Sequence, residues 1–291
     1  MSIAEGSTTA NDLRFAYLEA GSGPLALCLH GFPDSAWTWR HLLPALADAG
    51  YHAVAPFLRG YAPTEVPADG RYQTGVLGLD ACALHEALGG DQEAVIIGHD
   101  WGAMATYVAA NHEPERWRRV VTMAVPPAGA VAQGFLTYRQ LKRSWYMFFF
   151  QHALSDMVVG MDDLSFIDGL WEDWSPGYDA SEDVPHVKDC LRDPANLQAA
   201  LGYYRATLGG IGVDPALDEV QNKAALPTQQ PTLYLHGRTD GCMGVEVAEL
   251  ASGALTSPGS RLELVDDAGH FLHVERPDHV NGLVLDFLAE G

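Results

Sequence analysis

Short apolar runs rich in β-forming residues alternate with longer helix-like stretches over much of the chain. The longer stretches at residues 75–88 and 101–111 have the length and residue types of helices. The short runs predict strands at residues 25–29, 53–55, 94–97, 120–125, 232–235 and 261–265. Because strands and helices alternate, the pattern predicts an α/β fold with a mostly parallel sheet flanked by helices.

This alternation is interrupted from shortly before the middle of the chain. Residues 128–225 are rich in aromatic side chains and helical in pattern, as in SWYMFFFQHAL and ANLQAALGYYRATL, and the sheet pattern resumes at Pro231. We therefore expect one core domain, built from residues 1–127 and 226–291, with residues 128–225 inserted as a helical cap. Ligand sites in open α/β sheets lie at the carboxyl ends of the strands, so such a cap would roof the site.

Composition and charge narrow the possible partners. Hydrophobic residues make up 47% of the chain, and 17 Lys and Arg face 38 Asp and Glu, giving a formal charge of −21. A field of that sign repels phosphate backbones and anionic lipids, which disfavours nucleic-acid and membrane roles. The first residues lack the pattern of a signal peptide, and no stretch approaches the roughly 18 apolar residues of a membrane span. We expect a cytoplasmic protein, with a homodimer left open as its assembly state.

The cysteines give no sign of a metal site. Cys28, Cys82, Cys190 and Cys242 are far apart and match neither a C-x-x-C pair nor a zinc spacing. Cys28 and Cys82 lie in apolar runs and are expected to be buried, reduced thiols. We expect neither a metal nor an organic cofactor.

The pentapeptide GHDWG at residues 98–102 follows a predicted strand and precedes a predicted helix. This is the context of a nucleophile elbow, in which flanking glycines permit a sharp turn that presents the central side chain. The central residue here is Asp100. Taken alone the motif is weak, because Asp also caps the first turn of many helices.

The order of later residues supports the elbow. In α/β-hydrolases an acid and then a histidine follow the nucleophile, each after a later strand. Asp240 follows one predicted strand in HGRTDG, and His270 follows the next in DDAGHF. Each would pass alone for a turn or surface residue, but their joint placement predicts a triad of Asp100, Asp240 and His270.

A loop after the first predicted parallel strand supplies a further part. The sequence HGFP begins at His30, at the position where such folds place one backbone donor of an oxyanion hole. The second donor is the residue after the nucleophile. We expect these donors to be Phe32 and Trp101, although HGFP would also suit an ordinary turn.

The segments HGFPDSAWTW, GHDWGA, HGRTD and GHFLHVERP closely resemble those of the epoxide hydrolases of the α/β-hydrolase superfamily, over about residues 13–287. The resemblance implies a core with a helical cap and an alkyl ester formed on Asp100. It also implies two cap tyrosines that donate hydrogen bonds to the epoxide oxygen, and the matching positions are Tyr146 and Tyr204. Without the resemblance, both tyrosines would be read as aromatic packing.

The same resemblance implies an apolar or aromatic pocket, for which we expect His30, Pro33, Trp101 and Phe149 as lining residues. The partner would be a small apolar or aromatic epoxide, which water opens to a vicinal diol. Asp is already an anion at neutral pH and needs no base to attack. His270, oriented by Asp240, would then activate the water that clears the ester.

Two alternative functions use the same fold. A haloalkane or haloacid dehalogenase would share the triad and expel a halide, but such enzymes carry Asn where this chain has Phe32, or Arg where it has Trp101, and haloalkane dehalogenases lack the cap tyrosines. A serine esterase is disfavoured because position 100 is not Ser. A ligand-binding protein without catalysis is the more remote alternative, since folds of this kind host both.

Overall fold

The computed structural model describes residues 2–290, and within them one sheet of eight strands forms the centre of the molecule. The strand order is β1-β2-β4-β3-β5-β6-β7-β8. The strands are β1 (Ala4–Ala10), β2 (Leu13–Gly21), β3 (Leu25–Leu29), β4 (His52–Pro56), β5 (Val95–His99), β6 (Arg119–Met123), β7 (Thr232–Gly237) and β8 (Arg261–Val265). All neighbours from β4 to β8 pair in parallel, whereas β1 and β2 form an antiparallel edge.

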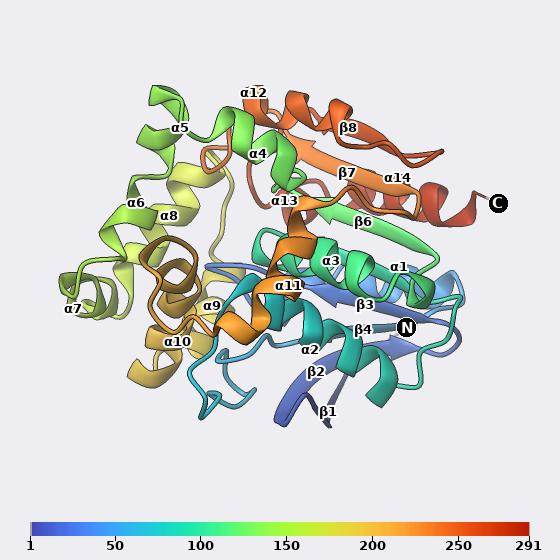
Figure 1. Cartoon of the computed structure of the whole chain (residues 1–291), viewed down its shortest axis with the longest axis horizontal. Coiled ribbons are helices and arrows are strands. Elements are labelled where there is room, and N and C mark those ends of the chain that lie inside the picture. The colour runs from blue at the N-terminus through green and yellow to red at the C-terminus, as the bar shows by residue number, and fades with distance from the viewer. Residues whose placement is uncertain (1, 291) are drawn as a thin grey trace.

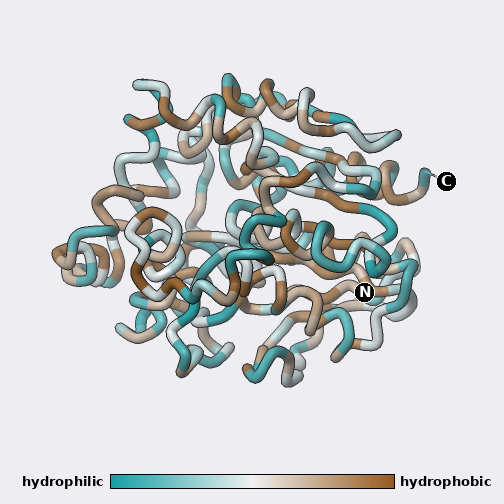
Figure 2. Tube along the Cα trace, viewed as in Figure 1, coloured by the Kyte–Doolittle hydropathy of each residue, from teal (hydrophilic) through white to brown (hydrophobic). Residues whose placement is uncertain are grey.

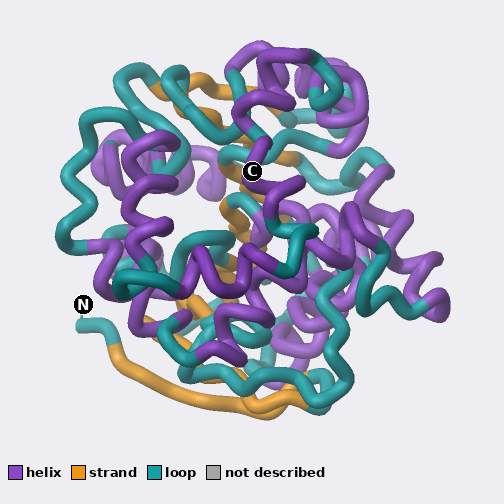
Figure 3. The backbone as a smooth tube through the Cα atoms, turned by 90° about the vertical axis from the view of Figure 1, so that its left-hand side faces the viewer, coloured by secondary structure: helices purple, strands orange, loops and turns teal. Residues whose placement is uncertain are grey.

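Helices cover both faces of this sheet (Figures 1 and 3). On the core they are η1 (Ala36–Trp39), α1 (Leu42–Asp48), α2 (Thr74–Ala87), α3 (Trp101–His112), η2 (Pro114–Arg116), α12 (Val245–Ala248), η6 (Glu249–Gly253), α13 (Leu272–Glu275) and α14 (Pro277–Ala289). α2 packs against α3, and α1 packs against α14. The expected α/β-hydrolase architecture is confirmed.

Burial explains which strands can be recognised in the sequence. Every residue of β3, β5, β6 and β7 is buried, because helices on both faces leave no side of a parallel strand in water. Such strands become continuous apolar runs, and Figure 2 shows these hydrophobic segments passing through the sheet. All six predicted strands are present, and two have the predicted ends.

The antiparallel edge formed by β1 and β2 was missed. β1 is largely exposed or half-buried, and β2 buries Leu13, Phe15 and Leu18 between more exposed positions. A strand with one wet face has no continuous apolar run, so the edge is hard to recognise in the sequence.

Every described element between β6 and β7 is helical. These elements are α4 (Ala128–Gly134), α5 (Tyr138–Arg143), α6 (Trp145–Phe149), α7 (Leu154–Gly160), α8 (Ser165–Trp174), α9 (Asp183–Leu191), α10 (Pro194–Tyr204), the π-helical η3 (Arg205–Gly209), η4 (Pro215–Leu217), α11 (Asp218–Gln221) and η5 (Asn222–Ala225). α4 packs on α12 and α11 packs on α2, so both ends of the insertion rest on the core. The middle helices, α5 to α10, lie beyond the ends toward which the parallel strands point (Figure 1). We retain residues 128–225 as the proposed extent of the cap.

All four cysteines are buried and free, which confirms the burial expected for Cys28 and Cys82. Among the described residues, no helix has the length and apolar character needed to cross a membrane.

Candidate active site

Asp100 occupies the turn between β5 and α3. Its backbone has φ +52° and ψ −117°, a conformation that costs free energy for a residue with a Cβ atom. A Cβ built on Gly98 would lie 2.2 Å from the Gly102 carbonyl oxygen, and one on Gly102 would lie 2.0 Å from the Leu29 carbonyl oxygen. Only glycine fits at both positions, and the turn therefore has the geometry of the predicted elbow.

The structure brings the three predicted triad residues together. His270 Nδ1 lies 3.0 Å from Asp240 Oδ2, and His270 Nε2 lies 3.6 Å from Asp100 Oδ2. The other oxygen of Asp240, Oδ1, accepts hydrogen bonds from the backbone N–H groups of Cys242 and Met243, at 2.7 and 2.9 Å. Asp240 follows β7 and His270 follows β8, so neighbouring strand ends position the acid and the imidazole.

The charges of this group are coupled. Burial alone would lower the pKa of His270, but the carboxylates of Asp240 and Asp100 outweigh burial and raise this pKa to about 10. Burial alone would raise the pKa of Asp100, but the charged His270 beside it outweighs burial and lowers the pKa. The free protein therefore holds an imidazolium between two carboxylates at neutral pH.

One of the two expected backbone donors contacts Asp100 directly. The Phe32 N–H donates a hydrogen bond of 2.9 Å to Asp100 Oδ1. Trp101 is the first residue of α3, so its N–H has no partner one helical turn earlier. Its ring packs edge-on against Tyr204, with 5.0 Å between ring centroids.

Tyr146 and Tyr204 meet above Asp100 in the roof of one cavity. Their ring centroids are 5.6 Å apart and their planes nearly perpendicular. The Tyr146 hydroxyl lies 3.3 Å from Cys242 Sγ, whereas the buried Tyr204 hydroxyl has no hydrogen-bond partner. Burial is the main reason that the pKa of both tyrosines lies well above the ordinary value, so both hydroxyls keep their protons.

This cavity has a volume of about 170 Å³. Most of its lining is apolar or aromatic, from core helices and loops on one side and from the helical insertion on the other. The lining residues are Thr74, Asp100, Trp101, Met104, Val125, Val131, Phe135, Ser144, Tyr146, Met147, Tyr204, Thr207, Gln221, Cys242 and Met243.

Of the four side chains expected to line the pocket, only Trp101 does so. His30 Nε2 instead accepts a hydrogen bond from the Leu58 N–H. The Pro33 carbonyl accepts one from the Trp171 indole N–H.

Phe149, the third of these side chains outside the cavity lining, stacks on Phe166 of the helical insertion. Its neighbour Phe150 turns inward and packs edge-on against Tyr204. Since α6 is a helix, consecutive aromatic residues point in different directions, and the sequence did not show which one faces the site.

Cys242 is the reactive side chain of the cavity that the sequence analysis did not propose for the site. It was considered only for disulfide and zinc spacing, yet it follows the predicted acid Asp240 by two positions. That proximity in the chain was the available signal, because the turn that presents Asp240 also presents its neighbours.

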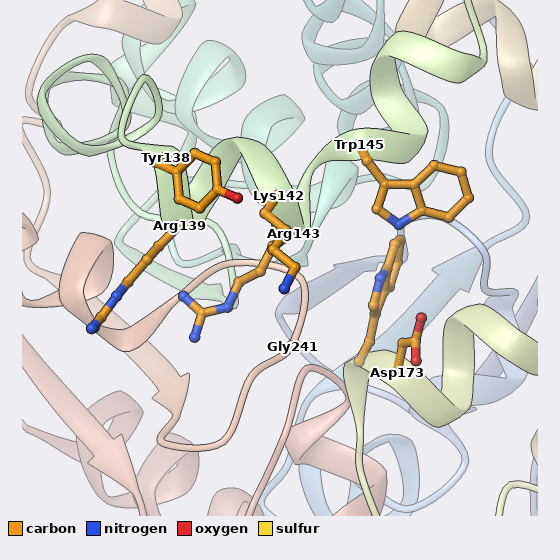
Figure 4. Close-up of a pocket in the computed structure, with 8 residues that line it drawn as sticks. Tyr138, Arg139, Lys142, Arg143, Trp145, Asp173 and Gly241 are labelled. Carbon is orange, nitrogen blue, oxygen red and sulfur yellow. The ribbon is translucent and has the colours of Figure 1, made fainter.

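A larger and more open cavity, of about 670 Å³, borders Gly241 but contains no triad residue. Figure 4 shows Arg139, Lys142 and Arg143 of α5 beside the Gly241 loop. The guanidinium of Arg143 is paired with Glu246 at 2.7 Å. We therefore assign the reaction site to the smaller cavity, which holds Asp100.

Two buried groups of side chains have the chemistry to hold a metal ion. One is Asp34, His99 and His273, and the other is Asp100, Cys242 and His270. In each group the ligating atoms lie within 4.8 Å of one another.

Comparison with known proteins gives consistent results. A family model described as alpha/beta hydrolase fold matches residues 24–277. Epoxide hydrolase A from Mycobacterium tuberculosis is 30% identical over 96% of this chain and 95% of that protein. Epoxide hydrolase 4 from Mus musculus is 30% identical over 96% of this chain and 77% of its own length.

Solved structures agree with these relatives. The crystal structure of epoxide hydrolase A from Mycobacterium thermoresistibile has a TM-score of 0.82 at 28% identity, covering 99% of this chain and 98% of that one. A Bacillus megaterium epoxide hydrolase, solved with an inhibitor, has a TM-score of 0.81 at 26% identity, covering 98% and 100%.

The coupled charges make a prediction that needs no substrate. In a ¹⁵N imidazole NMR titration, His270 should remain protonated through neutral pH and titrate near pH 10, and Asp100→Asn should lower that pKa because one carboxylate is removed. The buried His99, whose pKa burial and the nearby His270 lower to about 3, should stay neutral throughout and serves as the internal control.

Protein stability should follow the same titration. A raised pKa means that the stabilisation from His270 is complete below its ordinary pKa of about 6.5 and is lost as the pH rises through about 10. Titration of His270 near 6.5 in both proteins would contradict the ion pair.

Proposed function

The chain belongs to the α/β-hydrolase fold family and to its epoxide hydrolases, and from that premise we propose that it opens its epoxide by forming a covalent ester on Asp100. One observation carries this proposal. The carboxylate of Asp100 and the hydroxyls of Tyr146 and Tyr204 belong to side chains that line the same small cavity.

Asp100 is suited to attack an epoxide carbon. Its pKa is lowered, so it is an anion at neutral pH. The Phe32 N–H holds Oδ1 and leaves Oδ2, which lies 3.6 Å from His270 Nε2, to form the new C–O bond. An anionic carboxylate needs no base for this step, which distinguishes it from a serine nucleophile.

As the ring opens, its C–O bond breaks and the epoxide oxygen becomes an alkoxide. The Tyr204 hydroxyl has no partner and can donate to this oxygen without first breaking another hydrogen bond. The Tyr146 hydroxyl lies beside the Cys242 thiol, which is a weak acceptor, so the hydroxyl can turn to the stronger acceptor. An alkoxide is a much stronger base than tyrosinate and takes the proton.

Ester formation then changes the charge beside His270. Asp100 becomes neutral, so one of the two carboxylates that raise the pKa of His270 is lost. The imidazolium then releases its proton more readily, and this proton restores the tyrosine hydroxyl that was ionised during ring opening. The neutral imidazole can now accept a proton from water, while Asp240 holds its Nδ1 side. The hydroxide formed attacks the ester carbonyl, and the N–H groups of Phe32 and Trp101 hold the oxyanion. The acyl C–O bond then breaks, the departing alkoxide takes the remaining proton of the attacking water, and the diol leaves Asp100 as a carboxylate beside the imidazolium.

The dimensions of the cavity favour a small substrate. Its volume of about 170 Å³ is below the roughly 300 Å³ at which sites for drug-sized ligands begin. With its apolar and aromatic lining, this supports a small apolar or aromatic epoxide.

The function is tested by supplying an epoxide and a halide side by side. Purified protein is expected to convert styrene oxide to its diol and to release no bromide from 1-bromobutane, measured by chromatography and a halide assay. Bromide without diol would instead favour a dehalogenase, with Trp101 as the halide donor.

The covalent step is tested by a variant that should stall. In His270→Gln the nucleophile remains but the base is gone, so styrene oxide should add its full mass to the protein and the ester should persist in intact-mass spectra. The double variant Asp100→Ala, His270→Gln is the control and should add no mass. If the single variant formed no adduct with any of several epoxides, that result would count against the ester.

The tyrosines are tested by removing only their hydroxyls. Tyr146→Phe combined with Tyr204→Phe should slow ring opening by at least ~100-fold, because two donors to the leaving oxygen are lost. The rate is measured as the single-turnover formation of the ester. Tyr203→Phe is the matched control, since its buried hydroxyl donates to the Arg59 carbonyl instead of facing the cavity. A double variant with the wild-type rate would assign both residues to packing.

A further inference from the structure

Three side chains of the kinds that zinc binds meet beside the catalytic cavity, and two of them, Asp100 and Cys242, line it. Asp100, Cys242 and His270 are buried, with their ligating atoms within 4.8 Å of one another. Nε2 of His270 is fully buried and has no hydrogen-bond partner. Carboxylate, thiolate and imidazole are the three usual protein ligands of this ion. We propose that the cluster is an inhibitory binding site for Zn²⁺ and similar borderline cations.

The spacing of the donor atoms fits tetrahedral coordination after a small adjustment. Zinc–ligand distances of about 2.0–2.3 Å separate neighbouring ligands by about 3.3–3.7 Å. His270 Nε2 and Asp100 Oδ2 are already 3.6 Å apart. The ligating sulfur of Cys242 lies within 4.8 Å of both partners, and it turns about a single side-chain torsion.

Hydrogen bonds behind the cluster already orient two of the ligands. His270 Nδ1 is held by Asp240 at 3.0 Å, which is the carboxylate–histidine arrangement that supports zinc-binding histidines. Asp100 Oδ1 is held by the Phe32 N–H. The fourth coordination position would face the cavity beneath the cap tyrosines and remain open to water, as in zinc sites with three protein ligands.

The second buried cluster is a weaker candidate. None of Asp34, His99 and His273 lines the catalytic cavity, so an ion that enters the cavity does not reach them. Asp100 and Cys242 line the cavity itself. A protein of net charge −21 also concentrates cations near a site that contains carboxylates.

Coordination would block both halves of the proposed reaction at once. The ion would occupy the oxygen of Asp100 that attacks the epoxide and the nitrogen of His270 that accepts a proton from water. Cys242 binds as thiolate and His270 as neutral imidazole, and their protons pass to the solvent. A cation held by the Cys242 thiolate would therefore make the nucleophile Asp100 inaccessible to the substrate.

The site is tested with metal-free full-length protein and Co²⁺ as a spectroscopic substitute for Zn²⁺. One Co²⁺ per chain should bind, with a sulfur-to-cobalt charge-transfer band in the near ultraviolet and the visible bands of a tetrahedral ion. In parallel, added Zn²⁺ should inhibit epoxide turnover, and a chelator should restore it. The spectrum needs no turnover, so the metal site and the proposed reaction can fail independently.

Variants assign the ligands. Cys242→Ser keeps a hydroxyl near Tyr146 but removes the sulfur, so the charge-transfer band should disappear and the inhibitory Zn²⁺ concentration should rise at least ~10-fold. Cys82→Ala removes a thiol buried between α2 and α3 and should change neither readout. If Cys242→Ser does not fold, Asp100→Ala should weaken Co²⁺ binding by a similar factor and leave the sulfur band.

Two outcomes would overturn the inference. Absence of the sulfur band in the wild type would mean that Cys242 is only a partner of Tyr146. Unchanged zinc inhibition in Cys242→Ser would place the inhibitory ion elsewhere.

Discussion

Burying charge beneath the helical insertion is the constraint on which the rest of this molecule depends. A carboxylate loses its hydration when it is buried and must recover that free energy from partners. Asp100 has the Phe32 N–H and His270, and Asp240 has two backbone N–H groups as well as the imidazole. These partners come from loops after β3, β7 and β8, so the whole sheet must be assembled before the charges can be buried together.

The cap meets the same constraint in a different way. It contributes aromatic rings that exclude water, and two of them carry hydroxyls. Tyr146 and Tyr204 pack against each other and against Phe150, so each hydroxyl is held by ring packing while little else competes for its proton. A buried hydroxyl without a good acceptor costs free energy while the cavity is empty. The same hydroxyl stabilises the transition state once an oxygen in the cavity develops negative charge.

The sequence could predict features that depend on residues close together in the chain and on the order of the motifs. Continuous apolar runs located the parallel strands, and glycine spacing with chain order located Asp100, Asp240 and His270. It could not predict contacts set by the packing of distant elements. The alternating strand β2 lacks the apolar run that would reveal it, the direction of Phe149 depends on the rotation of α6 in the cap, and His30 is held by the backbone of Leu58. Cys242 was missed because a lone thiol acquires meaning only through the side chains that face it.

The same balance of charges also determines the order of events in the proposed reaction. While Asp100 is an anion, His270 is held as an imidazolium and cannot act as a base, so water in the cavity is not activated before the epoxide reacts. Forming the ester removes the anion, so the imidazolium can lose its proton. The imidazole therefore becomes a base only when there is an ester to hydrolyse. Any ligand that neutralises Asp100 without forming an ester disturbs this sequence. A cation bound to Asp100 and His270 would keep the imidazole neutral but would occupy its Nε2 atom. The reaction would then stop before the epoxide could reach Asp100.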